Sequence, residues 1–338
     1  MPGLVMLAML RYALDEEPMR LDLLKQADWA GIATLSIGLA SLEFVLEEGN
    51  RNNWFESHEI AFISVVSAVS LVSFVWFQLT RDNPLLNLRI LKDRQFFLGN
   101  LANCAIGLGM YGSVFLLPMY LSSIQNYNAL QIGEVMLWGG LPQLLLIPLI
   151  PLIPRLMQFI DKRWLCLFGL LMFAISVYQN AFMTADYSGD QFRFSLVLRA
   201  IGQPFIMVTL SVIALEKLEM KDIYSASSLY NTSRNLSGAV GIAILSTMVD
   251  RRGTLHELRI SEGISLFDAN TQEYLSRLKE ALPSLSQQQD LALLMGKVSK
   301  DATIMAFSDA FLVIAVSLFM GFLAVMVIGS GTKEKSMG

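Results

Sequence analysis

One apolar block of the sequence carries polar and small residues at helical spacing. Five of them, at spacings of 4, 3, 4 and 3, share one face of a helix: Ser227, Asn231, Arg234, Gly238 and Gly241. Arg234 lies about 12 Å into this block at 1.5 Å per residue, and its guanidinium cannot lose its proton. Either Arg234 lines an aqueous cavity and holds a polar or anionic group, or it caps carbonyls of a neighbouring helix. The two glycines favour close helix packing.

Two other apolar blocks carry candidate cavity residues. Arg199 and Gln203 are one helical turn apart. Because Arg199 is near the predicted outer end of its block, it either lines a cavity or extends to the membrane interface. Asn100 and Asn103 share a helix face, where they either face a cavity or bond to adjacent helices. Polar groups within lipid usually face a bundle interior or a wet cavity.

Gln143 lies in a block that contains Pro142, Pro148, Pro151 and Pro154. These prolines predict a bent or broken helix, which membranes tolerate where the helix lines a cavity or packs within protein. The predicted cavity-lining set is therefore as follows: Asn100, Asn103, Gln143, Arg199, Gln203, Asn231 and Arg234.

The composition shows which solvent must surround these helices. Of 338 residues, 54% are hydrophobic and only 16% are charged, whereas soluble domains carry roughly a quarter charged residues. The mean hydropathy is +0.51. With a net charge of −4 and no dense basic patch, nucleic acid is not an expected partner. The surroundings are therefore a lipid bilayer.

Residues that could bind metal or perform catalysis are sparse. His58 and His256 are far apart, and Cys104 and Cys166 lie within apolar blocks. This pattern predicts no disulfide, metal site or cofactor. The chain is not expected to be an enzyme, because no paired-carboxylate or Ser–His arrangement falls at a membrane interface.

Eight apolar blocks approach the roughly 20 residues that a transmembrane helix needs. They are Trp29–Leu46, Ile60–Leu79, Phe96–Tyr120, Gln131–Ile153, Trp164–Phe182, Phe194–Leu215, Ala226–Val249 and Ala306–Ile328. None shows the period-two alternation of a membrane β-strand. The fold class is predicted to be an all-α membrane protein with eight spans.

Basic residues orient these spans. On one side fall fourteen: Arg11, Arg20, Lys25, Arg81, Arg89, Lys92, Arg94, Arg155, Lys162, Arg163, Lys217, Lys221, Lys333 and Lys335. The three short loops on the other side hold only Arg51 and Arg193. The positive-inside rule therefore places the C-terminus in the cytoplasm. The long outer segment 250–303 does not overturn this assignment, and a surface helix is expected at Asn270–Leu282.

Several motifs, in this order, resemble the fourteen-span drug:proton antiporters of the EmrB/QacA type, a branch of the major facilitator superfamily. They are Asp-Trp-Ala-Gly at 28–31, Asn-Pro-Leu-Leu-Asn-Leu at 83–88, Leu-Pro-Met-Tyr-Leu at 117–121, Arg-Ala-Ile-Gly-Gln-Pro at 199–204 and the Asn231–Gly241 face. The resemblance implies three parts. Residues 1–28 are the end of span six and a cytoplasmic central loop, 29–95 are two linker helices, and 96–338 are the C-terminal six-helix bundle.

The segment 154–163 resembles the second copy of the superfamily's loop motif, in which an acid and basic residues hold conformational contacts at a cytoplasmic helix junction. This assigns such a role to Arg155, Asp161, Lys162 and Arg163. Lys162 and Arg163 could be present only because cytoplasmic loops are rich in basic residues. Asp161 has no such explanation, so it is the residue most expected to have a conformational role.

The resemblance predicts the C-terminal half of an inner-membrane permease that exports an amphipathic compound in exchange for protons. The N-terminal half is absent, and alternating access needs two halves, so the chain is expected to be incomplete. EmrB-like members also imply a periplasmic adaptor and an outer-membrane channel as partners. Two alternatives stay open: an uptake transporter of the same superfamily, and a non-transporting membrane scaffold.

Overall fold

Helices make up the regular structure of this chain. The computed structural model describes residues 2–13, 28–81, 84, 86–264, 269–282 and 286–328, and no strand occurs within them. The α-helices are α1 (Pro2–Ala13), α3 (Trp29–Glu48), α4 (His58–Thr80), α5 (Arg94–Ser123), α6 (Ala129–Leu146), α7 (Leu152–Leu156), α8 (Lys162–Gln179), α9 (Gly189–Leu215), α10 (Ile223–Glu262), α11 (Ala269–Ala281) and α12 (Gln287–Val327). The prediction of an all-α protein is confirmed.

Four basic residues used to orient the spans, Arg20, Lys25, Lys333 and Lys335, lie outside the described residues. The same is true of most of the central loop and of two positions in the 83–88 motif. Those predictions rest on the sequence alone.

Seven helical segments in the described part are long and apolar enough to cross a membrane: Trp29–Glu48, His58–Thr80, Arg94–Ser123, Ala129–Leu149, Lys162–Phe182, Gly189–Leu215 and Gln288–Val327. They match seven of the eight predicted spans. The eighth predicted span lies in α10, which carries Asn231, Arg234 and Asn235 and is more polar. Because α10 packs lengthwise against α5 and α12, its polar residues need not face lipid.

Side-chain caps begin several of these helices. The carboxylate of Asp28 accepts the backbone N–H of Gly31 at 2.9 Å, and that of Asp93 accepts the N–H of Phe96 at 2.8 Å. Such caps satisfy N–H groups that have no partner within the helix. The predicted break in the proline-rich span is confirmed, because α6 ends at Leu146 and a 3₁₀ turn (Ile147–Leu149) precedes α7.

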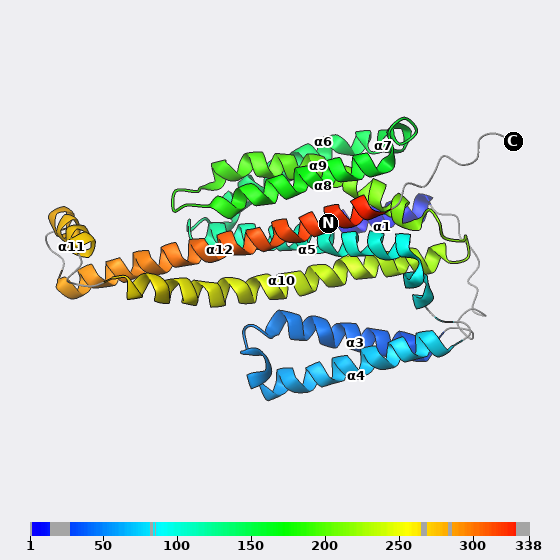
Figure 1. The fold of residues 1–338 in the computed structure, drawn as a ribbon, viewed down its shortest axis with the longest axis horizontal. Helices are drawn as coiled ribbons and strands as arrows, with labels where there is room; N and C mark the ends of the chain where they lie inside the picture. Colours follow the sequence, from blue (N-terminus) through cyan, green and yellow to red (C-terminus); the bar gives the residue numbers. More distant parts are fainter. Residues whose placement is uncertain are drawn as a thin grey trace.

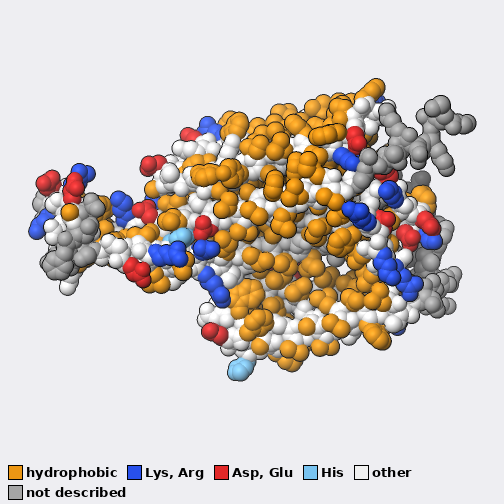
Figure 2. Space-filling model, viewed as in Figure 1, with side chains coloured by type: hydrophobic (Ala, Val, Ile, Leu, Met, Phe, Trp, Pro, Cys, Tyr) orange, Lys and Arg blue, Asp and Glu red, His pale blue; other side chains and the backbone are white. Residues whose placement is uncertain are grey.

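The helices are arranged as a bundle with a separate two-helix hairpin on one side (Figure 1). In the bundle, α5 contacts α9, α10 and α12, while α8 packs on α9 and α12. The hairpin of α3 and α4 meets the bundle where α3 contacts α10. Figure 2 shows hydrophobic side chains over the middle of the molecule and charged side chains gathered toward its two ends, as expected for lipid surroundings.

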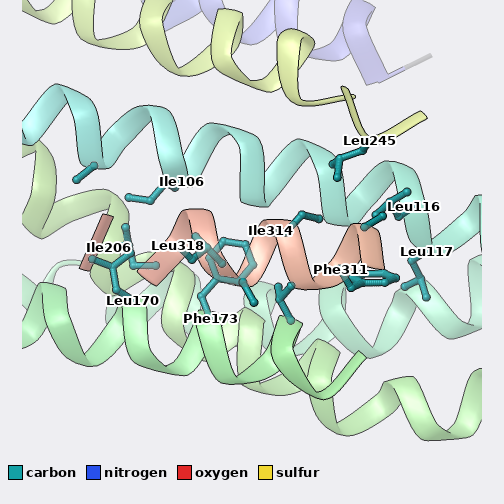
Figure 3. Close-up of a cluster of buried hydrophobic side chains, with 14 of the residues drawn as sticks. Ile106, Leu116, Leu117, Leu170, Phe173, Ile206, Leu245, Phe311, Ile314 and Leu318 are labelled. Carbon is teal, nitrogen blue, oxygen red and sulfur yellow. The ribbon is translucent and has the colours of Figure 1, made fainter. Parts of the chain in front are cut away.

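The bundle core forms around α12 (Figure 3). Phe311, Ile314 and Leu318 on α12 meet Phe173 of α8 and Leu116 of α5, all at most 1% exposed. Close packing of large side chains holds membrane helices together where lipid offers no hydrophobic driving force.

The segment 250–303, which the sequence predicts to lie on the outer side, is mostly helical in its described residues. α10 continues to Glu262 and α12 begins at Gln287, so both helices run past the predicted span ends. The surface helix expected at 270–282 corresponds to α11, which ends one residue earlier. At 1.5 Å per residue, α10 and α12 are each about 60 Å long, twice the roughly 30 Å hydrocarbon thickness. A helical projection with α11 at its tip results (Figure 1).

Candidate functional site

A cavity of about 240 Å³ opens between α5, α6 and α9. Its polar lining consists of Gln143, Arg199 and Gln203, and methionines 110 and 136 contribute sulfur. Three residues that the sequence predicted as cavity-lining therefore converge here from α6 and α9. A cavity with one cation, two amides and adaptable methionine side chains suits an amphipathic ligand that carries hydrogen-bond acceptors.

Arg199 points into the bundle. Its Nη1 donates a hydrogen bond to the Oγ of Ser113 on α5 at 2.8 Å. The same side chain borders a second, small polar cavity of about 10 Å³ together with Ser176, Asn180 and Ser195. These contacts favour the cavity-lining alternative for Arg199 over extension to the interface, because its hydrogen bond goes to Ser113 on α5 and its side chain borders both cavities.

Gln203 lies one turn further along α9 and faces the same cavity. Its Nε2 contacts the Sδ of Met110 at 3.6 Å, and a thioether is only a weak acceptor. The amide is therefore left with hydrogen-bonding capacity toward the cavity. A ligand with a carbonyl or carboxylate could use this capacity in exchange for the weak sulfur contact.

Arg234 lies on α10, where its partners are neutral. Nη2 donates to the Oδ1 of Asn231 at 2.9 Å, and Nη1 contacts the Sδ of Met207 on α9 at 3.1 Å. Within the described residues, no carboxylate pairs with Arg234, and its side chain makes no hydrogen bond to a backbone carbonyl of a neighbouring helix. The charge is instead held between α9 and α10 by one amide and one thioether.

Asn100 and Asn103 bind α5 to α10. The Nδ2 of Asn103 donates to the backbone oxygen of Tyr230 at 2.7 Å, and that of Asn100 donates to the Oγ of Ser233 at 3.1 Å. Both asparagines are buried. The geometry favours the alternative in which these amides bond to the adjacent helix, so the seven predicted residues do not form one site.

The glycines of α10 pack closely, as predicted. A Cβ on Gly238 would collide with the ring of Tyr111, and one on Gly241 would meet Leu108 at 2.8 Å. The reciprocal contact is Gly107 of α5, whose added Cβ would collide with the backbone oxygen of Arg234. Close approach of these backbones fixes the position of Arg234 at the α5–α10 interface.

The predicted conformational loop, residues 154–163, runs from α7 into the start of α8. Lys162 forms an ion pair with Glu216, which follows the last residue of α9. Asp161 caps α8 by accepting the backbone N–H of Arg163 at 3.0 Å. Arg155 is exposed in α7, and Nη2 of Arg163 is buried without a hydrogen bond in the described residues. In this arrangement Lys162 makes the contact between helices, and Asp161 shapes the turn.

Comparison with known proteins decides the family. A model described as Major Facilitator Superfamily matches residues 3–242. The chain belongs to the Major Facilitator Superfamily. The resemblance to EmrB-type exporters seen in the motifs is confirmed by Multidrug export protein EmrB of Escherichia coli strain K12, which is 30% identical over 297 residues. That match covers 85% of this chain and 55% of the relative.

Other relatives of this superfamily member carry resistance functions in their names. Colistin resistance protein EmrB of Acinetobacter baumannii is 24% identical over 337 residues, covering 98% of this chain and 65% of the relative. Fatty acid resistance protein FarB of Neisseria gonorrhoeae is 28% identical over 290 residues, covering 84% and 55%. The chain thus spans between about half and two thirds of the length of these curated relatives.

Some contacts of this superfamily member were not predicted from sequence. The Nε2 of His256 on α10 lies 2.9 Å from the Oδ2 of Asp309 on α12, and Arg252 approaches the same oxygen at 3.8 Å. Asp309 lies three residues inside a predicted span, and an ionisable residue at that position was the available signal. Ser113, the acceptor for Arg199, gave no such signal because serine is common in membrane helices.

Polar contacts also hold the end of the bundle at the α8–α9 turn together. The Oη of Tyr120 donates to the backbone oxygen of Tyr187 at 2.9 Å, and the Nε2 of Gln125 donates to that oxygen at 3.0 Å. Desolvation by burial raises the pKa of the Tyr187 hydroxyl above its ordinary value. This phenol therefore stays neutral at physiological pH. The α8–α9 turn is held against α5 by the backbone oxygen of Tyr187, which accepts from both Tyr120 and Gln125.

Proposed function

We propose that this chain is the substrate-binding C-terminal half of a proton-driven permease that exports amphipathic compounds. The observation that supports this most is the cavity where Gln143, Arg199 and Gln203 meet between membrane-spanning helices. Relatives named for multidrug export and for resistance to colistin or fatty acids support the direction of transport. No chemical conversion of the substrate is part of this proposal.

A first six-helix half is part of the proposed machine. Alternating access places the substrate site between two halves that rock around it. The matched relatives are longer than this chain, which covers 55% of the Escherichia coli protein. We therefore propose that export requires a partner half that completes the cavity opposite α5, α6 and α9.

The test uses everted membrane vesicles and a fluorescent amphipathic dye. With the first half co-expressed, a pH gradient that makes the vesicle interior acidic should drive dye into the vesicles. Uptake into everted vesicles corresponds to export from a cell. Arg199→Ala and Gln203→Ala should each lower the initial rate, because they remove the polar lining of the cavity. Ser122→Ala, an exposed change at the end of α5 whose hydroxyl bonds to its own helix backbone, is the control. Equal rates for all four proteins, or no uptake under any gradient, would overturn the proposal.

We propose a bacterial inner-membrane location with the C-terminus in the cytoplasm. The basic residues support this orientation, and so do contacts between linkers assigned to the same side. Asn87 donates to Asp222 at 2.9 Å between two inner linkers, whereas Asn50 donates to Asp250 between two outer segments. Labelling of single cysteines at Leu88 and Asn50 in intact cells tests the orientation: only the second should react with a membrane-impermeant maleimide.

The helical projection of α10, α11 and α12 is the proposed contact for a periplasmic adaptor that leads to an outer-membrane channel. Support comes from the EmrB-type resemblance and from the length of α10 and α12 beyond the membrane. Deleting residues 263–286 should abolish cross-linking to the adaptor while the membrane part still folds. Unchanged cross-linking would remove this segment from the proposed interface.

A further inference from the structure

The hairpin of α3 and α4 is a closely packed unit. The Oγ of Ser67 on α4 donates to the backbone oxygen of Gly38 on α3 at 3.0 Å. Near the end of α4, Gln78 donates to the carboxylate of Asp28 at 2.9 Å and accepts the backbone N–H of Leu86 at 2.8 Å. Because Asp28 precedes α3 and Leu86 follows α4, the two helices and the chain after them form one body.

Two hydrogen bonds fasten this body to α10, one at each end of the hairpin. The hairpin lies beside α10 (Figure 1). In the turn between α3 and α4, the Nδ2 of Asn50 donates to the carboxylate of Asp250. In the segment after α4, the Nδ2 of Asn87 donates to the carboxylate of Asp222 at 2.9 Å. Both bonds join an amide to an ionised acceptor, and such bonds are stronger than those between two neutral groups.

The contact between the two ends is looser. A cavity of about 240 Å³ separates α3 from α10 there, and its lining includes Leu39, Leu46, Leu236 and Ala239. Lipid offers no hydrophobic driving force for helix association, which depends instead on close packing and polar contacts. Since the packing of α3 on α10 leaves this cavity, the two end bonds supply a large part of the attachment.

Both bonds lead to the same straight element. Asp222 directly precedes α10, Asp250 lies within it, and the 40 residues of Ile223–Glu262 form one α-helix without proline. The two carboxylates are therefore about 42 Å apart along one helix at 1.5 Å per residue. A body attached at two distant points of one rod can neither slide along the rod nor tilt away from it.

We propose that α10 carries the α3–α4 hairpin, so that the hairpin and the bundle move as a single body. The boundary between the moving parts of the transporter then does not fall between α4 and α5, although the chain has a linker there. The inference rests on the proposed function where it concerns movement during transport. The attachment itself is a property of this chain and is tested on it first.

The first experiment measures distances between spin labels by double electron–electron resonance. It uses the purified chain in detergent, with both native cysteines replaced by alanine. Phe55→Cys with Ser122→Cys places labels on the hairpin and the bundle near the Asn50 bond. Thr80→Cys with Lys217→Cys does the same at the opposite end, and all four positions are exposed. Each pair of labels therefore reports on one of the two bonds.

Loss of one bond should free only the end that it holds, because the other bond then acts as a pivot. Asn50→Ala should broaden the distance distribution of the 55–122 pair alone, and Asn87→Ala that of the 80–217 pair alone. The matched control is Asn52→Ala in the same turn, since Asn52 bonds to Glu48 within that segment; it should broaden neither. Unchanged distributions in both variants, or equal broadening of the two pairs, would overturn the proposal.

The second experiment measures dye transport in everted vesicles, with the first half co-expressed. One protein carries Asn50→Cys with Asp250→Cys and another Asn87→Cys with Asp222→Cys, and a short bifunctional maleimide bridges each pair. Bridging should leave the rate unchanged, since it joins groups that already move together. A rate lost on bridging would overturn the proposal. If the unbridged proteins transport nothing, the proposed function fails, whereas the spin-label distances still decide the attachment.

Discussion

The guanidinium of Arg199 on α9 donates a hydrogen bond to the hydroxyl of Ser113 on α5 at 2.8 Å. This contact lies at the junction of two cavities, since Arg199 borders both the 240 Å³ cavity and the small polar cavity behind it. Arg199 is thus a half-buried cation with a neutral hydrogen-bond partner, and no carboxylate pairs with it in the part of the chain that the structure describes. That charge remains available to an anionic or polar group on a ligand.

Replacing Ser113 by alanine should therefore destabilise the bundle. The guanidinium would lose its acceptor, and an unmade hydrogen bond to a charged group costs roughly 1 to 3 kcal/mol. The thermal unfolding midpoint in detergent should fall by several degrees. Ser122→Ala is the matched control on the same helix, because the exposed Ser122 bonds only to its own helix backbone at Met119. Equal midpoints for the two variants would contradict this role of Ser113.

Gly107→Ala should separate α5 from α10. The new Cβ would collide with the backbone oxygen of Arg234, and a backbone atom cannot rotate away as a side chain can. Alanine normally stabilises a helix interior relative to glycine by up to about 1 kcal/mol, so a fall in the unfolding midpoint must come from the collision. Gly133→Ala on α6 meets nothing within 4 Å and should leave the midpoint unchanged or slightly raised. A midpoint for Gly107→Ala at or above that of the parent chain contradicts this packing.

Apolar block length predicted most of the fold, because a helix in lipid must satisfy its backbone internally and needs a fixed length to cross. The convergence of Gln143, Arg199 and Gln203 was also predictable, since polar residues in spans turn toward protein or cavity. The neutral partners of Arg199 and Gln203 were not predictable, because Ser113 and Met110 carry no unusual pattern of their own.

The outer ends of α10 and α12 escaped prediction for a different reason. Hydropathy reports contact with lipid, and a helix that leaves the membrane can become charged without ending. Arg251 and Arg252 therefore suggested a loop at a point where α10 continues for ten further residues to Glu262. The pairing of His256 with Asp309, 53 positions apart, depends on this continuation and could not be found without it.

Asp28→Asn should loosen the hairpin of α3 and α4. The carboxylate of Asp28 accepts hydrogen bonds from the N–H of Gly31 and the Nε2 of Gln78, each at 2.9 Å, and pairs with Arg81. The side-chain oxygen of asparagine can still cap α3 by accepting the N–H of Gly31. Its NH₂ group, however, would face the Nε2 of Gln78 or the guanidinium of Arg81, which are themselves donors. The cost should be on the order of 1 to 3 kcal/mol, visible as faster hydrogen exchange in α3 and α4.

Asp93→Asn is the control for that measurement. Asp93 caps α5 through the N–H of Phe96, and asparagine caps a helix as well as aspartate does. Hydrogen exchange near α5 should therefore stay unchanged. If both variants have equal effects, the contacts of Asp28 with Gln78 and Arg81 contribute nothing beyond the cap.

Asp309→Ala should open the contact between α10 and α12 at the end of the bundle from which the helical projection extends. His256 is 8% exposed and would lose its partner, and a buried donor left unsatisfied costs about 1 to 3 kcal/mol. Arg252 contributes less, because its side chain is 48% exposed and solvent screens such pairs. Hydrogen exchange of 250–262 should accelerate, whereas Asp301→Ala on the same helix should change it little. Unaltered exchange in the first variant would count against the His256 contact.

Reversing the charges of Lys162 and Glu216 distinguishes a contact between helices from a simple topological signal. The pair is partly exposed, at 22% and 39% of its side chains, so each change should alter stability by less than about 1 kcal/mol. Export in vesicles should fall several-fold for Lys162→Glu alone, because two carboxylates would then face each other at the end of α9. The double variant Lys162→Glu with Glu216→Lys restores the attraction and should regain most of the rate. A double variant that stays inactive while Lys162→Arg is fully active would contradict this role of the ion pair. Lys162 would then act as a positive charge that sets the membrane topology, and its contact with Glu216 would not matter for export.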